Sequence, residues 1–318
     1  MYLQSYVLTH ATTHSLDRYL PYEINFVQMK KILKIIGWTF LILILIGIGI
    51  GTYFYQTNPM IKAIVNNDES KLYYFPTKEM ANMDDIDYSE SILNIEDSIK
   101  IYTYEFKATG NKKANIFLVH GAGGNVSSYK SLIKPLIENG FGVYALDWRG
   151  YGKSTGIPNY KGVMKDTEIA FQDFIRKTTK DSLKTIVYGL SLGGQMAVKI
   201  TKDNQNRVNL LVLDGTVESA QSLAIDYAPV EYLKEKAEES PEDFNQDYVA
   251  VRDIAYIKNI PKLIIHSRID RDIPFFRGKN VFDSAREPKE FWETETDHIM
   301  TLRDLTDEAI EKITNKIR

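Results

Sequence analysis

Cysteine is absent from the 318 residues of this chain. Its absence excludes disulfide bonds, a thiol nucleophile and lipid attachment through cysteine, although it does not identify the compartment. A large excess of charge is also missing, because 39 basic residues stand against 42 acidic ones and the net charge is −3. That balance gives no reason to expect a nucleic-acid partner. We see no internal repeat and no low-complexity tract, so the chain is expected to bury one large core.

Charged residues are also missing from one long stretch near the start of the chain, Ile35–Tyr55. As a helix rising about 1.5 Å per residue, this stretch reaches roughly 31 Å, enough to cross the hydrocarbon core of a bilayer. A soluble core helix would show a polar face, and the run from Leu41 to Ile46 has none. Residues 29–56 are therefore predicted to be an uncleaved membrane anchor. A cleaved signal peptide is the alternative, but the apolar stretch is long for one and no small-residue cleavage motif follows it.

Basic residues flank this stretch unevenly. Lys30, Lys31 and Lys34 precede it, whereas the first basic residue after it is Lys62. The positive-inside rule therefore predicts a cytoplasmic N-terminus, with the rest of the chain on the non-cytoplasmic side.

The segments on either side of the anchor contain few signals. Residues 1–28 are interpreted as an N-terminal tail, which a start at Met29 would make dispensable. His10 and His14 lie in this tail four positions apart, but no helix-forming context or further ligand supports a metal site. Residues 57–98 are acidic and are predicted to connect the anchor to the remaining domain.

The most informative stretch runs from Ile186 to Gly194 and has the sequence I-V-Y-G-L-S-L-G-G. A β-branched strand leads directly into G-x-S-x-G, which places Ser191 at the apex of a sharp strand-to-helix turn. Gly189 and Gly193 flank the serine because a Cβ at either position would crowd the turn. The residues that follow are helical in character, so a helix N-terminus points at Ser191 and favours negative charge there. The alternative is an ordinary glycine-rich turn between a strand and a helix.

A serine nucleophile needs a general base. Of the five histidines, His298 alone lies in a late loop after the serine motif, where a strand-like run ends in a polar turn. His120 and His266 lie at strand ends instead. His298 is therefore the candidate base, although a lone late histidine is by itself also typical of an exposed loop.

The base in turn needs an orienting carboxylate. Asp270 follows the apolar strand Leu263–His266 by four residues, and Asp272 is its rival in the same polar loop. For either acid, the plain alternative is a solvated loop residue or a partner for a neighbouring arginine. The chain order Ser191, Asp270, His298 favours the first acid, because each of the three follows a predicted strand at the carboxyl edge of a parallel sheet.

A glycine-rich loop supplies a fourth element. The buried-strand run 114–119 is followed by H-G-A-G-G-N, beginning at His120. The amide of Ala122 in this loop and the amide of Leu192 after the serine are candidate oxyanion donors. A phosphate-cradling loop is the alternative, but the G-K-[ST] ending of a P-loop is missing.

With these motifs, residues 99–318 resemble the α/β-hydrolase family. The segment D-W-R-G-Y-G-K-S, which starts at Asp147, is a familiar companion motif in that family and implies a structural role for Arg149. Two departures are present: Ser267 replaces the glycine common after the strand-end histidine, and Asp297 replaces the glycine common before the catalytic one. The resemblance implies a mostly parallel central sheet with helices on both faces and a short lid over about 215–261, all preceded by the transmembrane helix.

Strand patterns of this domain are separated by helical ones, as a parallel sheet requires. They lie near 99–106, 115–119, 143–147, 185–189, 209–214, 262–266 and 289–293. The first is predicted to be an antiparallel edge strand because of its β-branched and aromatic content. In the lid, Tyr227, Tyr232, Phe244 and Tyr248 either line an acyl site or pack within a small helical subdomain.

The function expected from this pattern is a serine hydrolase that cleaves a carboxylic ester, a lipid ester or an acyl-thioester through an acyl-enzyme. No cofactor and no metal is expected. The expected partners are a small-molecule or lipid acyl substrate and the bilayer around residues 35–55. A serine aminopeptidase-like peptidase is the second hypothesis, and a non-catalytic interaction protein that keeps the fold is the third. Haloalkane and epoxide chemistry are disfavoured, because those relatives carry aspartate at the nucleophile position.

Overall fold

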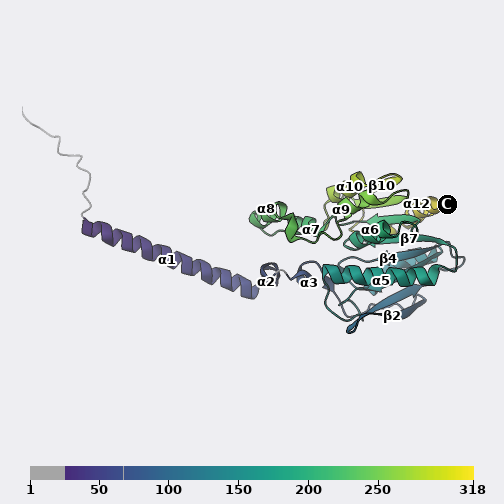
Figure 1. The fold of residues 1–318 in the computed structure, drawn as a ribbon, viewed down its shortest axis with the longest axis horizontal. Coiled ribbons are helices and arrows are strands. Elements are labelled where there is room, and N and C mark those ends of the chain that lie inside the picture. The colour runs from purple at the N-terminus through teal and green to yellow at the C-terminus, as the bar shows by residue number, and fades with distance from the viewer. Residues whose placement is uncertain (1–25, 67) are drawn as a thin grey trace, which may run out of the picture. The chain divides into compact units, whose positions relative to one another are not determined.

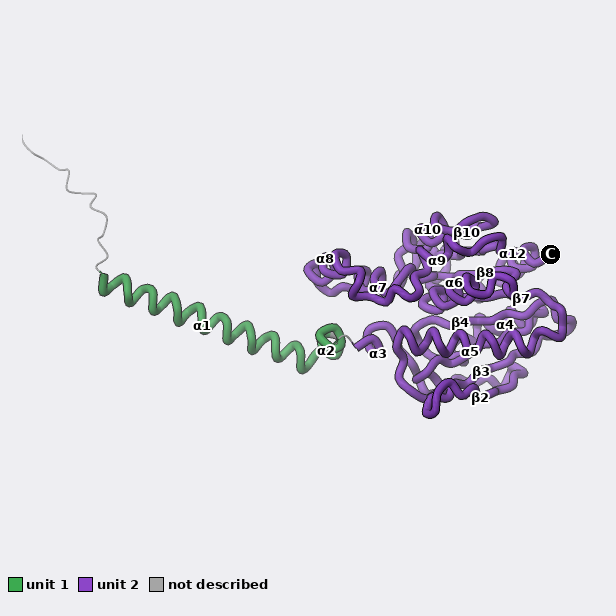
Figure 2. Tube along the Cα trace, viewed as in Figure 1, with its two compact units in different colours: residues 1–66 green, residues 67–318 purple. Residues whose placement is uncertain are grey.

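The computed structural model describes residues 26–66 and 68–318, which fall into two units, residues 1–66 and 67–318 (Figure 2). The tail residues His10 and His14 lie outside the described residues. Unit 1 contains α1 (Phe26–Thr57) and α2 (Pro59–Val65). Among the described residues, α1 is the one helix long and apolar enough to cross a membrane, and none of it is buried in protein.

The main sheet of unit 2 has eight strands in the order β10-β9-β8-β7-β4-β6-β3-β2. Its strands are β2 (Tyr88–Glu96), β3 (Ile99–Phe106), β4 (Ala114–Val119), β6 (Phe141–Asp147), β7 (Lys184–Leu190), β8 (Leu210–Asp214), β9 (Lys262–Ser267) and β10 (Lys289–Thr294). The pairs β2–β3 and β3–β6 are antiparallel, and the pairs from β6 to β10 are parallel. A two-residue strand β1 (Phe75–Pro76) pairs with β5 (Gly123–Gly124) in a separate small sheet.

Helices cover both faces of this sheet (Figure 1). The helices of unit 2 are α3 (Glu69–Leu72), α4 (Lys130–Glu138), α5 (Tyr160–Thr178), α6 (Gly193–Asp203), α7 (Ala220–Asp226), α8 (Glu231–Glu239), α9 (Ala250–Asp253), α10 (Phe275–Ser284), α11 (Thr301–Asp304) and α12 (Thr306–Ile317). Successive side chains of a strand point to opposite faces, so β4 sends Phe117 and Val119 into the core under α5, α6 and α10. Ile116 and Leu118 enter the core under α4 and α12. The central strands are buried on both faces, which explains their unbroken apolar sequences.

Two sequence predictions about the start of this unit are wrong in detail. The segment 57–98 is not a connector throughout, because residues 88–96 form β2 and pair with β3 along their length. As a result β2, and not the strand at 99–106, forms the edge of the sheet. The prediction failed because β2 is rich in polar residues and lacks a clean apolar alternation, so its place in the sheet comes from pairing with β3 and not from apolar content.

The parallel arrangement positions the candidate site. β7, β9 and β10 run in the same direction and end in loops at one edge of the sheet. Ser191 follows β7, Asp270 follows β9 and His298 follows β10. Side chains from three distant parts of the sequence are thereby brought to a common edge.

Candidate active site

Ser191 occupies a strained turn between β7 and α6. Its φ is +50°, a left-handed backbone conformation that costs a residue with a side chain roughly 1–2 kcal/mol. The turn is held by the amide of Ser191, which donates to the carbonyl of Asp214 at 2.9 Å, and by the amide of Gly194, which donates back to Ser191 at 3.0 Å. A Cβ on Gly189 would stand 2.6 Å from the side chain of Ala197, so the close strand–helix approach requires glycine there.

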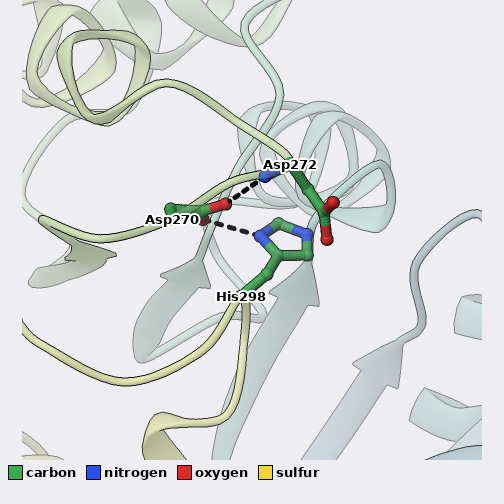
Figure 3. Close-up of side chains that lie close together, drawn as sticks. All are labelled: Asp270, Asp272 and His298. Atoms are coloured by element: carbon green, nitrogen blue, oxygen red, sulfur yellow. Dashed lines mark hydrogen bonds and ion pairs between the residues drawn. The ribbon is translucent and has the colours of Figure 1, made fainter.

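Asp270 and His298 form a direct hydrogen bond, with His298 Nδ1 2.6 Å from Asp270 Oδ2 (Figure 3). A carboxylate only accepts, so Nδ1 carries the proton and Nε2 keeps its lone pair, as a general base needs. The side chain of Asp270 is fully buried, and that of His298 is 14% exposed. Burial raises the pKa of Asp270, but the hydrogen bonds from His298 and from the amides of Ile273 and Asp272 outweigh it and hold this pKa below its ordinary value.

Gly215 lies between the turn that carries Ser191 and the loop that carries His298. It follows Asp214, the acceptor of the Ser191 amide, and has a φ of +59°. A Cβ on Gly215 would lie 2.8 Å from Cε1 of His298, so the imidazole packs directly on this backbone. Among the described residues, no hydrogen bond joins Ser191 to His298. In unliganded sites such contacts are often long and tighten only when substrate binds.

Asp272 lies on the other side of the imidazole from Asp270, toward the second ring nitrogen (Figure 3). Its carboxylate is exposed, and its amide donates to Oδ1 of Asp270 at 2.9 Å. One ligand atom from each of Asp270, Asp272 and His298 lies within 4.8 Å of the others. Both carboxylate oxygens of Asp270 already accept hydrogen bonds, from His298 and from the amides of Asp272 and Ile273, so this acid suits an orienting role better than metal binding.

The two candidate oxyanion donors flank the serine. Among the described residues, neither the amide of Ala122 nor that of Leu192 has a hydrogen-bond acceptor. The carbonyl of Ala122 accepts from the Tyr151 hydroxyl at 2.5 Å and from the Phe75 amide at 2.9 Å, which fixes the orientation of this loop. A Cβ on the preceding Gly121 would lie 3.2 Å from Cβ of Ser191, so the loop touches the serine. Two free amides beside Ser191 are what stabilisation of an oxyanion requires.

His120 supports that loop without taking part in proton transfer. Its Nδ1 lies 2.7 Å from the carbonyl of Gly121, and its ring packs 4.2 Å from the ring of Trp148, measured between centroids. Complete burial lowers the pKa of His120 to about 4. The ring is therefore neutral at ordinary pH, and its packing supports the backbone of the glycine-rich loop that begins at His120.

The D-x-R-G-x-G motif fixes the neighbouring loop. The buried guanidinium of Arg149 pairs with Asp166 of α5 at 2.7 Å, which agrees with a structural role. Asp147 accepts from the amide of Val126 at 2.7 Å and from the Tyr104 hydroxyl at 2.9 Å. Burial raises the pKa of Asp147 to about 6. Asp147 and Asp166 are both buried and hydrogen-bonded to other protein groups, so neither is a candidate for the catalytic acid.

With this geometry in place, comparisons with known proteins establish the fold. A family model described as Serine aminopeptidase, S33 matches residues 110–234. The alpha-beta hydrolase of Vibrio vulnificus superposes with a TM-score of 0.63 at 17% identity, covering 80% of this chain and 93% of that one. The esterase Pf2001 of Pyrococcus furiosus gives a TM-score of 0.59 at 18% identity, covering 77% and 96%. By fold, the chain is an α/β-hydrolase.

Curated sequences similar to this α/β-hydrolase include the uncharacterized protein YfhR of Escherichia coli (strain K12), 29% identical over 181 residues. That match covers 56% of this chain and 60% of the relative, so the chain spans about 60% of the length of the curated relative it matches. The family model includes Ala122, Ser191 and Leu192 but ends before Asp270 and His298. The candidate acid and base, Asp270 and His298, are therefore supported by the geometry described above and not by this match.

The segment predicted to form a lid, residues 215–261, contains α7 to α9. Its four candidate aromatic residues have different environments, so they do not form one acyl site. Tyr227 and Tyr232 are exposed, whereas Phe244 packs on the core and Tyr248 is buried against Tyr160 of α5. The Tyr227 hydroxyl donates to the carbonyl of Asp272 at 2.8 Å, so the predicted lid segment contacts the loop that carries Asp270 and Asp272.

Asp214 is a buried acid beside the site that the sequence did not single out. It ends β8, and its Oδ2 has no hydrogen-bond partner among the described residues. Burial raises the pKa of Asp214 to about 7, although the charge of His298 and the hydroxyl of Thr301 lower it somewhat. The available signal was an acid directly after four apolar strand residues, which alone does not distinguish a buried acid from an exposed one.

We expect Asp214→Asn to change the pH dependence of stability. Below about pH 4 the wild-type carboxyl is protonated in both the folded and unfolded states. Between pH 4 and about 7 only the unfolded state ionises, so the wild type loses about 1.4 kcal/mol per pH unit, and this loss is complete once pH passes the folded pKa. Asparagine cannot ionise and lacks this loss.

Urea unfolding at pH 5 and pH 7 measures the effect. The difference in the free energy of unfolding should widen in favour of Asp214→Asn as pH rises. Asp243→Asn, at an exposed position, is the matched control and should follow the wild type. Equal pH slopes for wild type and Asp214→Asn would show that the carboxyl is already ionised in the folded protein.

Proposed function

We propose that this α/β-hydrolase is a serine hydrolase that transfers an acyl group from a carboxylic ester, a lipid ester or an acyl-thioester to water. The observation that carries the proposal is the 2.6 Å hydrogen bond between His298 and Asp270, on loops that converge with the strained Ser191 turn. That combination supplies the hydroxyl of a half-buried serine, a base in the required tautomer and an acid that holds it.

In the proposed mechanism, Oγ of Ser191 attacks the substrate carbonyl while Nε2 of His298 takes the hydroxyl proton. Asp270 keeps the proton of Nδ1 in place and stabilises the imidazolium. The amides of Ala122 and Leu192 donate to the oxyanion, and His298 then protonates the leaving group as the carbonyl re-forms. Water attacks the resulting acyl-enzyme by the same route and regenerates Ser191.

A peptidase reaction is the second candidate, favoured by the match to the Serine aminopeptidase, S33 model. The same serine, histidine and acid serve both reactions, so the site geometry does not separate them. A panel of p-nitrophenyl esters of different chain lengths, assayed beside aminoacyl anilides, distinguishes the two. A chain that hydrolyses neither panel and fails to react with a fluorophosphonate would instead be a non-catalytic interaction protein.

We also propose that α1 anchors the hydrolase in a membrane. Its apolar side chains are exposed in this structure along the whole helix, and a bilayer is the environment that would cover them. Lys30, Lys31 and Lys34 on its N-terminal flank favour a cytoplasmic N-terminus and a catalytic unit on the opposite side. An acyl substrate held in or near that bilayer is consistent with this location.

This orientation predicts the outcome of a protease-protection experiment. Protease added to intact cells or spheroplasts should digest residues 67–318, while a cytoplasmic marker protein survives. Detergent lysis should expose both, which controls for the activity of the protease. Full protection of residues 67–318 would reverse the proposed orientation, and a soluble form cut near residue 56 would favour a cleaved signal peptide.

A further inference from the structure

His266 is a buried side chain next to the proposed acid, and the mechanism above gives it no role. It is the next-to-last residue of β9, and both it and Asp270 have fully buried side chains. Its Nε2 lies 3.0 Å from the carbonyl oxygen of Ile273 and 3.6 Å from Oδ2 of Asp270. The ring of Phe275 meets it edge-on at 6.0 Å between centroids. Asp270 therefore lies between two histidines.

The surroundings of His266 determine its tautomer. A carbonyl oxygen only accepts, so Nε2 carries a proton and donates it to Ile273. Nδ1 has no hydrogen-bond partner among the described residues and faces Gly278 of α10, where a Cβ would overlap the ring. Burial lowers the pKa of His266, so the ring is neutral. The result is a fixed N–H donor on a side chain with little room to move.

Ile273 closes the turn that carries Asp270. Its amide and the amide of Asp272 each donate to Oδ1 of Asp270 at 2.9 Å. Its carbonyl accepts from His266 on the other side of the turn. Oδ1 is thus occupied within the turn, and Oδ2 is left to meet His298 at 2.6 Å. The orientation of the carboxylate depends on where Ile273 is held, and His266 holds it.

We propose that His266 is a positioning residue for acyl transfer, whose Nε2–H pins the turn 270–273 and thereby directs Oδ2 of Asp270 at His298. The inference rests on the proposed function. His266 does not touch substrate, and at 3.6 Å it is too far from Oδ2 for a hydrogen bond, so it acts through the turn and through its dipole. Small displacements of an orienting group carry large rate penalties, which is why a second layer of fixed donors matters.

The test compares two replacements of similar reach in the full chain. His266→Gln keeps an N–H donor near the position of Nε2, whereas His266→Met fills the space without one. With a p-nitrophenyl ester, we expect His266→Met to lower kcat about 10- to 100-fold with little change in KM. His266→Gln should recover most of that loss. Thermal unfolding of each variant shows whether the fold is retained, and His266→Asn, whose shorter side chain misplaces the donor, replaces Met if the Met variant fails to fold.

A double-mutant cycle with Asp270→Asn separates positioning from general support of the fold. If His266 acts through Asp270, His266→Met should cost nothing further once Asp270 is replaced. An equal loss in both backgrounds, or an unchanged kcat in His266→Met, would overturn the inference while leaving the proposed function intact. A wild-type chain that neither hydrolyses the ester nor reacts with a fluorophosphonate would overturn both.

Discussion

Ser191→Ala is expected to abolish hydrolysis, with a loss in kcat on the order of 10⁶ relative to the wild type. The variant removes the oxygen that would attack the carbonyl but keeps Cβ, so the left-handed turn at φ +50° and its strain are retained. The fold should therefore be unchanged, which circular dichroism and thermal unfolding can verify. The hydrolysis of one activated ester by wild type and variant gives the size of the effect.

Covalent labelling provides an independent readout of the same serine. In the wild type, Oγ of Ser191 should displace fluoride from a fluorophosphonate and form a stable phosphonyl ester, and Ser191→Ala should not be labelled. Ser98→Ala, an exposed serine between β2 and β3, is the matched control and should label normally. Turnover at the wild-type level by Ser191→Ala would remove the basis of the proposed mechanism.

Asp270→Asn is expected to slow turnover by roughly 10⁴, because an amide in place of the carboxylate no longer enforces the tautomer of His298. The buried hydrogen bond of 2.6 Å between the two residues identifies the group being lost. Asp272→Asn is the matched control, two positions away and exposed. Its carboxylate makes no hydrogen bond to His298 among the described residues, so the expected loss is a factor of a few.

Both variants are compared at one pH with the same activated ester, and kcat and KM are measured separately. The assignment requires a fall in kcat for Asp270→Asn that far exceeds that for Asp272→Asn. If Asp272→Asn is the more damaging change, the two acids must be exchanged, and the bond between Asp270 and His298 would be structural.

The sequence predicted the parallel part of the sheet well, for a physical reason. Strands such as β7 and β8 are buried on both faces, so their positions are unbroken apolar runs between turn signals. The comparisons confirm the α/β-hydrolase fold inferred from those runs and from the Ser191 motif. β2 was missed because one side of it faces solvent and its sequence, Y-S-E-S-I-L-N-I-E, carries no strong pattern of its own.

The parts of the candidate site that depend on residues near each other in the sequence were predictable. The turn at Ser191 follows from glycines within two residues of it, and the sequence nominates Asp270 and His298 by position. The sequence alone does not decide between Asp270 and Asp272. The decision depends on the conformation of the turn 270–273, which two amide hydrogen bonds to Oδ1 of Asp270 stabilise in the folded protein. The hydrogen bond from Nε2 of His266 to the carbonyl of Ile273 joins β9 to that turn, and neither hydrophobic periodicity nor a sequence motif predicts it.

The place of β10 in the sheet has one more consequence. It is the outermost strand at its end of the sheet, paired with β9 alone, and His298 lies four residues beyond it. Strands at a margin open locally at a lower free energy than central ones. Fraying of β10 would withdraw the imidazole while β7 and its serine stay folded. If His298 is the base, we expect inactivation and global unfolding to be separate events, with the opening of β10 coming first.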